Sequence, residues 1–438
     1  MATAKVSPSE LPQAASISRW WRVVGGLSMN LALGSLYAWS LFVPELSKDP
    51  EFKMYKLTDF TLTFTIAVVV FALTFVVAGR IQDKKGPLIC SIIGGVLVSL
   101  GFYMSGHAHS LTALYFWFGA IGGLGNGFGY CTPIPVMAKW FPDRRGLAVG
   151  LAVAGYGGGS AIFGKLALNY LIPAYGWRST FEILGGIFLV MTLFGAFLLK
   201  NPPAGYRPAG WSPAPATSKA AATTYEFTPA ETLRTPTFYF MWVAYALGCS
   251  AGLMVISVLI PFFKESLKNT GMSPADIAGY AGTAFIVGAV GNAAGRILSG
   301  WMSDGLGRIN VLRLMIGISM VAMPILYLVG GSLGLLFTIV FVVYWCYGTQ
   351  LSVNGSAASD FWGTKNAGIN YGMLFTAWGV AGIVGPMLGA KLRVAYNSYQ
   401  VPFYTAAVLA AVALLCELAA KRPQVPAEAR GAAAKAVA

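Results

Sequence analysis

The sequence predicts an all-α integral membrane protein with twelve transmembrane helices in two six-helix halves. Of its 438 residues, 56% are hydrophobic and only 11% are charged, and the mean hydropathy is +0.65. A soluble domain carries roughly 25% charged residues, so the composition excludes a water-soluble enzyme and a disordered chain. Twelve apolar runs have the ~20 residues that a helix needs to cross about 30 Å of hydrocarbon. A repeat in the sequence divides these runs into two sets of six.

The runs lie near residues 21–44, 58–80, 87–106, 111–138, 146–170, 178–200, 238–264, 275–302, 309–330, 333–357, 367–390 and 400–420. Long apolar stretches punctuated by glycine fit helices, because barrel strands alternate with a period of two. Residues 1–19 lack an apolar targeting core, so we expect the first run to be a retained helix. The stretch 201–236, rich in Pro, Ala and Thr, predicts a flexible linker. It separates an N-terminal half (21–200) from a C-terminal half (237–420), and short tails (1–20 and 421–438) flank the two halves.

The basic residues predict the orientation of the helices. One alternating set of connections, which includes both ends of the chain, holds 20 of the 30 Lys and Arg residues, and the other set holds 8. Because cytoplasmic loops carry the excess of Lys and Arg, we expect both termini in the cytoplasm and the protein in the cell (inner) membrane. The same rule explains the net charge of +14 without a nucleic-acid partner. The five cysteines show no metal or redox spacing, and we expect no cofactor.

Two short segments repeat at an offset of 221 residues, with Gly79 and Asp83 matching Gly300 and Asp304. Each segment reads Gly, three residues, Asp and then a short basic turn that contains Gly. Each also joins the second apolar run of a half to the third. Transporters are commonly built from two repeated halves, with the substrate bound near mid-bilayer between them.

These two segments resemble the signature loop of the major facilitator superfamily, and the resemblance extends over residues 20–420. Five further segments resemble its oxalate/formate antiporter branch, which includes bacterial monocarboxylate transporters: 33–42 (LGSLYAWSLF), 139–148 (KWFPDRRGLA), 154–157 (AGYG), 359–363 (SDFWG) and 370–372 (NYG). The resemblance implies the major facilitator fold, in which the loops carrying Asp83 and Asp304 help to latch the cytoplasmic side. We expect Gly79, Gly300 and Arg144 to belong to the same conformational gate.

Arg296 is the strongest candidate for a substrate-binding residue. It lies in the eighth run, eight residues before Asp304, which is about 12 Å along a helix. An arginine in hydrocarbon costs from about 2.5 to 17 kcal/mol, depending on the reference state, so it needs a cavity and a negative partner. No Asp or Glu lies in the middle of any run. A substrate carboxylate would supply that charge and accept two parallel hydrogen bonds, whereas the alternative is an arginine paired with backbone carbonyls or reaching the interface. The resemblance favours the first interpretation, because the family's substrate-binding arginine falls on Arg296.

Three neighbours of this arginine refine the expected substrate. Asn292 lies one turn before Arg296, on the same helix face, where it would orient the guanidinium or bind the carboxylate. The resemblance implies a second cation, a lysine, in the oxalate carrier at the position of Trp378. One arginine balances one carboxylate, so Trp378 predicts a monocarboxylate. Leu36 occupies an apolar position where animal relatives tend to carry lysine.

Tyrosines and amides at helical spacing complete the expected site. Tyr37 lies in the first run, Asn126 and Tyr130 in the fourth, and Tyr347 in the tenth. The resemblance implies that these runs line the cavity, where tyrosine hydroxyls would bind the second carboxylate oxygen or a 2-hydroxyl or 2-keto group. Packing between helices is the alternative role for any one of these tyrosines.

We therefore expect a secondary active transporter, not an enzyme, that moves a small monocarboxylate of the lactate or pyruvate type by alternating access, with proton symport. Its partners would be a small organic anion with one carboxylate, a proton or counter-anion, and the lipid bilayer, and we expect a monomer. One alternative is exchange of oxalate for formate or of other organic anions. An anion channel or a transporter-like sensor is the alternative from another class. A membrane enzyme would need clustered His, Asp or Cys at membrane depth, which the sequence lacks.

Overall fold

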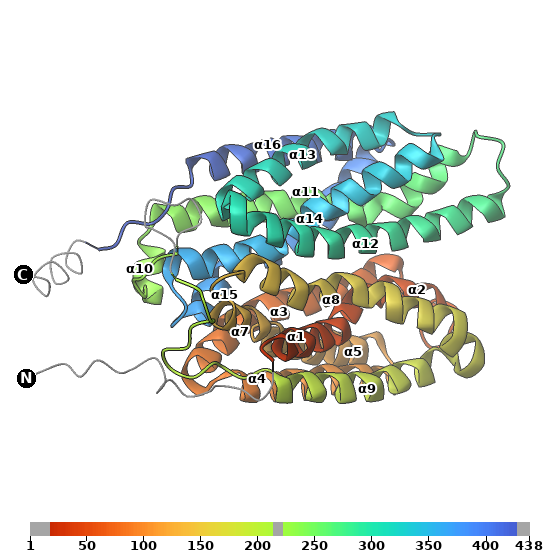
Figure 1. The fold of residues 1–438 in the computed structure, drawn as a ribbon. Helices are drawn as coiled ribbons and strands as arrows, with labels where there is room; N and C mark the ends of the chain where they lie inside the picture. The colour runs from red at the N-terminus through yellow and green to blue at the C-terminus, as the bar shows by residue number, and fades with distance from the viewer. Residues whose placement is uncertain (1–17, 213–221, 427–438) are drawn as a thin grey trace, which may run out of the picture.

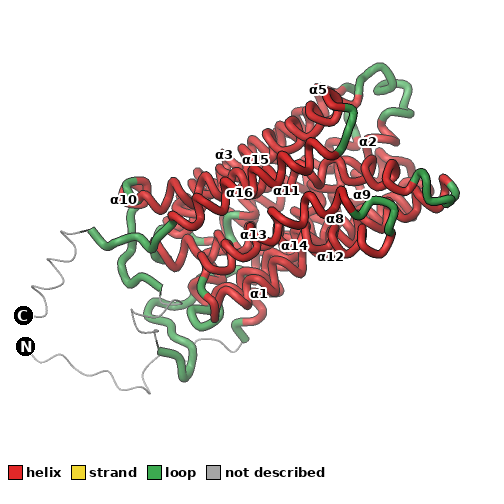
Figure 2. Tube along the Cα trace, turned by 90° about the horizontal axis from the view of Figure 1, so that it is seen from above, coloured by secondary structure: helices red, strands yellow, loops and turns green. Residues whose placement is uncertain are grey.

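The computed structural model describes residues 18–212 and 222–426, and every regular element in these ranges is a helix. Figure 1 shows the helices before the linker in the lower part of the bundle and those after it in the upper part. Figure 2 shows that the helices run along one long axis, with loops gathered at the two ends. This arrangement leaves the interface between the two sets of helices in the middle of the molecule.

The first set of helices comprises α1 (Trp20–Leu33), η2 (Gly34–Ala38), α2 (Trp39–Leu46), α3 (Leu57–Lys85), α4 (Pro87–Gly106), α5 (Leu111–Leu114), η3 (Tyr115–Ile121), α6 (Gly122–Tyr130), α7 (Pro133–Trp140), α8 (Arg145–Leu166), η4 (Ala167–Leu171) and α9 (Ile172–Leu198). The second set comprises α10 (Pro229–Leu233), α11 (Pro236–Leu267), α12 (Pro274–Leu306), α13 (Arg308–Leu328), α14 (Leu333–Trp362), α15 (Ala367–Tyr396) and α16 (Gln400–Ala419). We call these the first and second halves below.

The helices make twelve crossings, as the sequence predicts. Ten segments of the described chain are long and apolar enough to span a membrane. One of them, Arg145–Leu198, has 54 residues, more than twice the ~20 that one crossing needs. It divides at Gly176, whose φ of 75° suits glycine and breaks the helix. The series α5, η3, α6 and α7 makes the remaining crossing in shorter pieces.

Two irregular turns inside the bundle position side chains of the candidate site. The first crossing changes from α-helix to a 3-10 turn at η2, and Tyr37 lies in that turn. Gly34 begins the turn against the backbone of Tyr156, where an added Cβ would clash. Tyr130 ends α6, and α7 begins three residues later at Pro133, which has no amide proton to continue a helix. Breaks of this kind within a helix often mark functional positions.

Both described ends of the chain lie at the same end of the bundle, which we call the terminal face (Figure 1). Before α1, Arg19 donates two hydrogen bonds to Asp143, at 2.7 and 2.8 Å. At the start of α13, Arg313 donates to the carbonyls of Leu418 and Ala420 beside the end of α16. These contacts join the first and last helices to the turns of the terminal face.

The described parts of the linker pack against the terminal face. Directly before the linker, the Lys200 carbonyl accepts a 2.6 Å hydrogen bond from the indole of Trp140, and the Trp140 ring lies 4.7 Å from that of Tyr206. After the gap, the amide of Phe227 donates to the Trp362 carbonyl at 3.0 Å, and the Phe227 side chain is buried. These contacts attach the two ends of the predicted linker to the helices of the terminal face. Residues 213–221 lie outside the described residues.

Candidate substrate site around Arg296

Arg296 lies on α12 with none of its surface exposed. Its Nε donates to Asn292 Oδ1 at 2.9 Å, and its Nη1 donates to the Val153 carbonyl at 2.9 Å and to the Tyr130 hydroxyl at 3.4 Å. Asn292 is one turn earlier on the same helix, whereas Val153 and Tyr130 belong to the first half. The guanidinium is therefore held between the two halves. Of the two roles expected for Asn292, the structure shows contact with the guanidinium, which Asn292 orients.

The remaining guanidinium nitrogen, Nη2, is buried and has no hydrogen-bond partner among the described residues. No carboxylate in the described part of the chain lies within 4.0 Å of Arg296. Leaving a buried charged donor unpaired is costly, and removing the partner of a buried charge costs about 3–5 kcal/mol. The site therefore carries one positive charge in excess, and the Nη2 nitrogen holds two free N–H groups.

A cluster of tyrosine rings packs beside the guanidinium. The Arg296 Cζ lies 5.7 Å from the ring centroid of Tyr156, within the range of a cation–π contact. The Tyr156 ring packs edge-on against Tyr37 and Tyr130, with centroids 5.3 and 5.1 Å apart. Its hydroxyl donates to Asn126 Oδ1 at 3.0 Å. Asn126 therefore positions Tyr156 and does not reach Arg296.

Sequence reasoning did not select Tyr156 as a site residue, although it is the aromatic member of the segment 154–157 (AGYG). Hydropathy does not distinguish Tyr156, because a tyrosine in an apolar run is usually a residue that packs between helices. Its position between Gly155 and Gly157 was the available signal. Both glycines permit close approach, since an added Cβ on Gly155 would meet the Leu27 carbonyl and one on Gly157 would meet Asn292.

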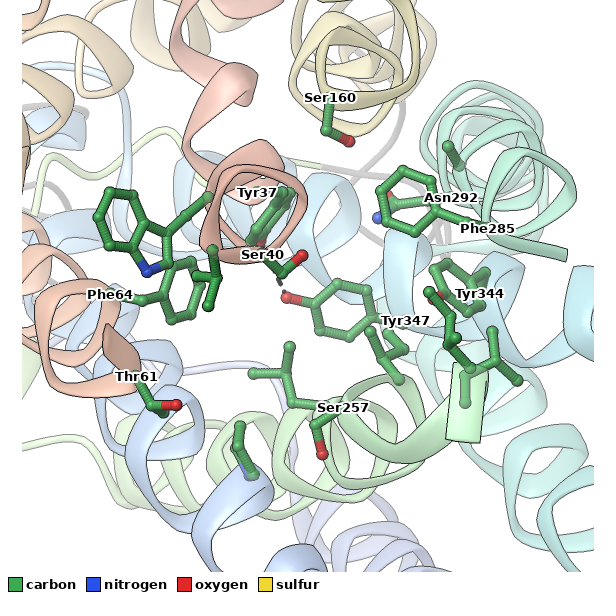
Figure 3. Close-up of a pocket in the computed structure, with 18 of the residues that line it drawn as sticks. Tyr37, Ser40, Thr61, Phe64, Ser160, Ser257, Phe285, Asn292, Tyr344 and Tyr347 are labelled. Atoms are coloured by element: carbon green, nitrogen blue, oxygen red, sulfur yellow. Dashed lines mark hydrogen bonds between the residues drawn. The ribbon is translucent and has the colours of Figure 1, made fainter. Parts of the chain in front are cut away.

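A chain of hydrogen bonds joins the two halves next to Arg296. The hydroxyls of Tyr37, from the first half, and Tyr347, from the second, are 3.1 Å apart. The Trp378 indole donates to the Tyr347 hydroxyl at 2.9 Å. Figure 3 shows the Tyr37 and Tyr347 hydroxyls meeting across the pocket. Trp378 is thus an interior residue that fixes Tyr347, and it does not face lipid.

A cavity of about 420 Å³ lies between this layer and the end of the bundle opposite the terminal face. Tyr37, Tyr347 and Asn292 line it (Figure 3), together with residues nearer the ends of α2, α11 and α12. Arg296 and Leu36 are not among its lining residues, and Leu36 is buried in the core. The structure thus brings Arg296, Asn292, Tyr130, Tyr37, Tyr347 and Trp378 together, and it leaves Leu36 and Asn126 in the packing around them.

On the other side of Arg296, the two halves are packed together down to the terminal face. Asp83 accepts hydrogen bonds from the amides of Gly368 and Ile369 at the start of α15, both at 2.9 Å. Asp304 accepts from the amides of Gly146 and Leu147 at the start of α8, at 2.8 and 2.9 Å. Each carboxylate caps the first turn of a helix in the other half, where the helix dipole favours negative charge.

The two capping carboxylates lie in the last turns of α3 and α12 and not in loops. Single glycines, Gly86 and Gly307, end these helices with φ of 85° and 87°. Gly79 and Gly300 lie one turn before Asp83 and Asp304 and make close backbone contacts across the halves. An added Cβ on Gly79 would clash with the Gly368 carbonyl, and one on Gly300 would clash with the Gly146 carbonyl.

Arg145, and not Arg144, bridges the halves at this face. Arg144 precedes α8, its side chain is 61% exposed, and its contact with Asp143 is 3.8 Å long. Arg145, the first residue of α8, pairs with Asp360 at 2.6 Å, and Arg308 pairs with the second oxygen of Asp360 at 2.7 Å. Adjacent residues point in different directions at a helix start, so the sequence could not tell which arginine turns inward.

The described residues form no metal-binding site. Among the described residues, no group of three or more His, Cys, Asp or Glu side chains could hold a metal ion. The five cysteines are free. The charged centre of the molecule is Arg296, and its surroundings are hydroxyls, an amide, an indole and aromatic rings.

Comparison with known proteins identifies the family. The sequence profile of the Major Facilitator Superfamily matches residues 25–343 and 253–437. The chain belongs to the Major Facilitator Superfamily. This result confirms the superfamily predicted from the repeated Gly-x-x-x-Asp segments, and it makes the protein a multi-pass membrane transporter and not an enzyme.

Its relatives include members of the branch that the sequence resembles. The chain is 29% identical over 366 residues to the uncharacterized MFS-type transporter YhjX of Escherichia coli (strain K12), covering 84% of this chain and 86% of that protein. It is 27% identical over 377 residues to the oxalate:formate antiporter of Oxalobacter formigenes, covering 86% and 85%. It is 28% identical over 326 residues to monocarboxylate transporter 11 of Mus musculus, covering 72% and 67%.

Solved structures share the fold. The crystal structure of the Escherichia coli fucose:proton symporter superposes with a TM-score of 0.64 at 16% identity, over 92% of this chain and 98% of that one. The same protein in the outward conformation gives a TM-score of 0.62 at 18% identity. Twelve helices in the major facilitator arrangement are consistent with both comparisons.

Proposed function

We propose that the protein is a secondary active transporter that moves a small monocarboxylate, of the lactate or pyruvate type, by alternating access. One observation carries this proposal. Arg296 is fully buried, its Nη2 is unpaired, and no described carboxylate neutralises it. A substrate carboxylate would accept hydrogen bonds from Nη2 and from the Tyr130 hydroxyl, whose oxygen already accepts from Nη1. A single cation matches a single carboxylate, and the resemblance implies that Trp378 occupies the position at which the oxalate carrier has a second cation.

The substrate would drive the conformational cycle by neutralising Arg296. A buried unpaired cation opposes closure of the cavity around it, whereas a paired one does not. A ligand shifts a conformational equilibrium only by its difference in affinity between the two states. We propose that the first half (21–200) and the second half (237–420) rock about the Arg296 layer, with Asp83, Asp304, Gly79 and Gly300 forming the gate at the terminal face. With the terminal face in the cytoplasm, the cavity on the opposite side would make the described conformation outward-facing.

The proposed location is the cell (inner) membrane with the terminal face in the cytoplasm, and the proposed unit is a monomer. The excess of Lys and Arg near the terminal face supports this orientation. A reporter fused to the C-terminus tests the orientation, since it should be active only when it is cytoplasmic. The mass of the detergent-purified protein, measured by light scattering, tests the monomer.

Proton symport is the proposed coupling. A bare monoanion moved against an inside-negative potential of 100 mV costs about 2.3 kcal/mol, and a co-transported proton cancels that charge. No carboxylate of the described chain pairs with Arg296. A proton on the substrate carboxyl group would remove the negative charge that neutralises Arg296, so the proposed proton carrier lies outside this contact. Exchange of organic anions is the second candidate, because it needs no proton at all and the chain is 27% identical to an oxalate:formate antiporter.

Uptake of radiolabelled L-lactate into proteoliposomes tests these candidates, with the pH gradient and the membrane potential varied separately. Uptake that follows the pH gradient, ignores the potential and is lost in Arg296→Ala supports symport. Lys165→Ala is the matched control, because it removes an exposed cation from another crossing. Lactate uptake that needs preloaded formate or oxalate supports exchange. The proposal fails if Arg296→Ala transports as well as the control.

A further inference from the structure

The cavity beside Arg296 is larger than a carboxylate requires. Its volume of about 420 Å³ lies within the ~300–1,000 Å³ typical of pockets that enclose whole ligands in mostly apolar walls. Its polar floor consists of Tyr37, Tyr347 and Asn292. The walls above the floor are mainly apolar, with no charged residue among the described residues that line them, and include Val43, Phe64, Leu253, Ile256, Phe285 and Ala289.

We propose that these walls form a tail pocket, so that the transporter selects monocarboxylates whose carbon skeleton ends in a branched or aromatic apolar group. The carboxylate would bind at Arg296 and the tail would extend toward Ala289 and Phe285. This inference rests on the proposed function and adds the chemical class of the tail. A three-carbon acid such as lactate would bind at the floor and leave the walls unused.

The spacing along α12 gives the pocket its direction. Phe285, Ala289, Asn292 and Arg296 follow one another at intervals of four, three and four residues, which is one face of a helix. Helical side chains lean toward the N-terminus of their helix, so the Arg296 guanidinium is directed toward Asn292, with which it bonds at 2.9 Å. Ala289 lies seven residues from Arg296, about 10 Å along the axis. A ligand held by its carboxylate therefore points its tail along this face.

Both halves contribute to the walls, which connects the tail to the transport cycle. Phe64 comes from α3 in the first half, whereas Ile256 and Phe285 come from α11 and α12 in the second. Figure 3 shows Phe64 and Phe285 on opposite sides of the Tyr37–Tyr347 contact. As the halves approach, a tail between them loses its contact with water on both sides. Since burial of apolar surface is favourable in proportion to the area removed from water, a longer tail favours the closed state.

A series of 2-oxo acids tests the tail pocket in proteoliposomes of the full-length protein. Pyruvate, 2-oxobutyrate, 3-methyl-2-oxobutyrate and phenylpyruvate are compared as inhibitors of radiolabelled L-lactate counterflow at fixed pH, with protein-free liposomes as the control for passive entry. We expect the inhibition constant to fall about fourfold per added methylene, the ratio that ~0.8 kcal/mol per buried CH₂ gives. Phenylpyruvate should bind more tightly than any of the aliphatic acids.

Two substitutions on neighbouring residues of α12 locate the effect. Ala289→Phe fills the proposed pocket, whereas Val290→Phe adds the same group to a residue that is 55% exposed on the outside of the helix. We expect the ratio of the pyruvate to the phenylpyruvate constant to fall about tenfold or more in Ala289→Phe, since a clash in a packed site costs ~1–3 kcal/mol, and to stay at the wild-type value in Val290→Phe. Ile256→Asn, which places an amide in the opposite wall, should lower the same ratio.

The possible failures are distinct. Inhibition constants that are constant or rise with tail length in the wild type overturn the tail pocket and leave the monocarboxylate proposal intact. A wild type that neither transports lactate nor responds to any acid of the series overturns the proposed function itself. An unchanged ratio in both Ala289→Phe and Ile256→Asn also overturns the pocket, because the tail would then lie elsewhere.

Discussion

The hydroxyl of Tyr37 in the first half lies 3.1 Å from the hydroxyl of Tyr347 in the second, and this contact separates Arg296 from the cavity. The two residues are 310 positions apart in the chain. Under the proposed function, a substrate that enters through the cavity would have to separate this pair to reach the guanidinium. The separated hydroxyls would then be available to the substrate, so the same two residues would close the floor of the cavity and supply hydrogen-bond donors.

Removing the hydroxyl of Tyr37 or of Tyr347 affects the Trp378 indole differently. Tyr347→Phe leaves the buried indole of Trp378 without its 2.9 Å acceptor, and an unsatisfied buried donor costs about 1–3 kcal/mol. Tyr37→Phe leaves the Trp378–Tyr347 bond intact. We therefore expect Tyr347→Phe to lower the thermal unfolding temperature in detergent more than Tyr37→Phe does. Equal unfolding temperatures for the two variants would show that the indole finds another acceptor.

Arg296→Lys should lower transport by a factor of about ten or more. Lysine keeps the charge but has no planar fork, so it cannot make two parallel hydrogen bonds to a carboxylate. It also cannot bond Asn292, Val153 and the substrate at once with the same geometry, and a charged hydrogen bond is worth ~1.5–3 kcal/mol. Initial rates of labelled lactate uptake measure the effect. Near wild-type uptake by Arg296→Lys would remove the arginine from the site.

Asn292→Asp should make substrate binding depend on pH. The new carboxylate would lie within hydrogen-bond distance of Arg296 Nε, where Asn292 Oδ1 now accepts at 2.9 Å. An ionised aspartate would neutralise the guanidinium and compete with the substrate, raising KM about tenfold or more at neutral pH, since a charged hydrogen bond contributes ~1.5–3 kcal/mol. Protonation at lower pH would relieve that competition, so KM should fall as the pH falls. A KM that stays at the wild-type value at every pH contradicts the assigned geometry.

Gly300→Ala should open the terminal face. An alanine normally stabilises a helix relative to glycine by about 1 kcal/mol, but here its Cβ would clash with the Gly146 carbonyl of the other half. The halves must then separate at this end. Spin labels at Lys84→Cys and Lys365→Cys, two exposed positions on opposite halves, would report a longer distance in a background without native cysteines. Gly305→Ala, where nothing lies within 4 Å of an added Cβ, should leave the distance unchanged.

Asp360→Ala should destabilise the protein more than Asp143→Ala. Asp360 is 4% exposed and pairs with both Arg145 and Arg308. Its loss leaves Arg145 without a carboxylate and Arg308 with Asp304 alone, at 2.8 Å, and a broken buried pair costs ~3–5 kcal/mol. Asp143 pairs with Arg19 in a contact that is more exposed to solvent. Thermal unfolding of the two purified variants compares them. If the Asp360→Ala protein were as stable as the Asp143→Ala protein, the Arg145 and Arg308 side chains must become solvated by water when Asp360 is lost.

The sequence predicted the crossings well because hydropathy is a local property. Each helix must cover its own backbone polar groups and present apolar side chains to lipid, so the runs near 87–106 and 400–420 differ little from α4 and α16. The same reasoning selected Arg296, since a cation in an apolar run is conspicuous wherever the chain folds. For a similar reason, the repeat of Gly79 and Asp83 at Gly300 and Asp304 selected residues that join the two halves at the terminal face.

Only the tertiary structure determined which residues meet. Tyr156 reads as packing in the sequence, yet its ring lies against Arg296 and its hydroxyl is held by Asn126. Arg144 and Arg145 are adjacent and alike, and only the start of α8 turns Arg145 toward Asp360. Contacts between segments more than a hundred residues apart depend on how helices pack, which composition and spacing do not encode. The sequence by itself therefore determined a twelve-helix membrane protein with an arginine deep in its eighth crossing. The packing of the two halves decided which groups hold that arginine and left its Nη2 unpaired.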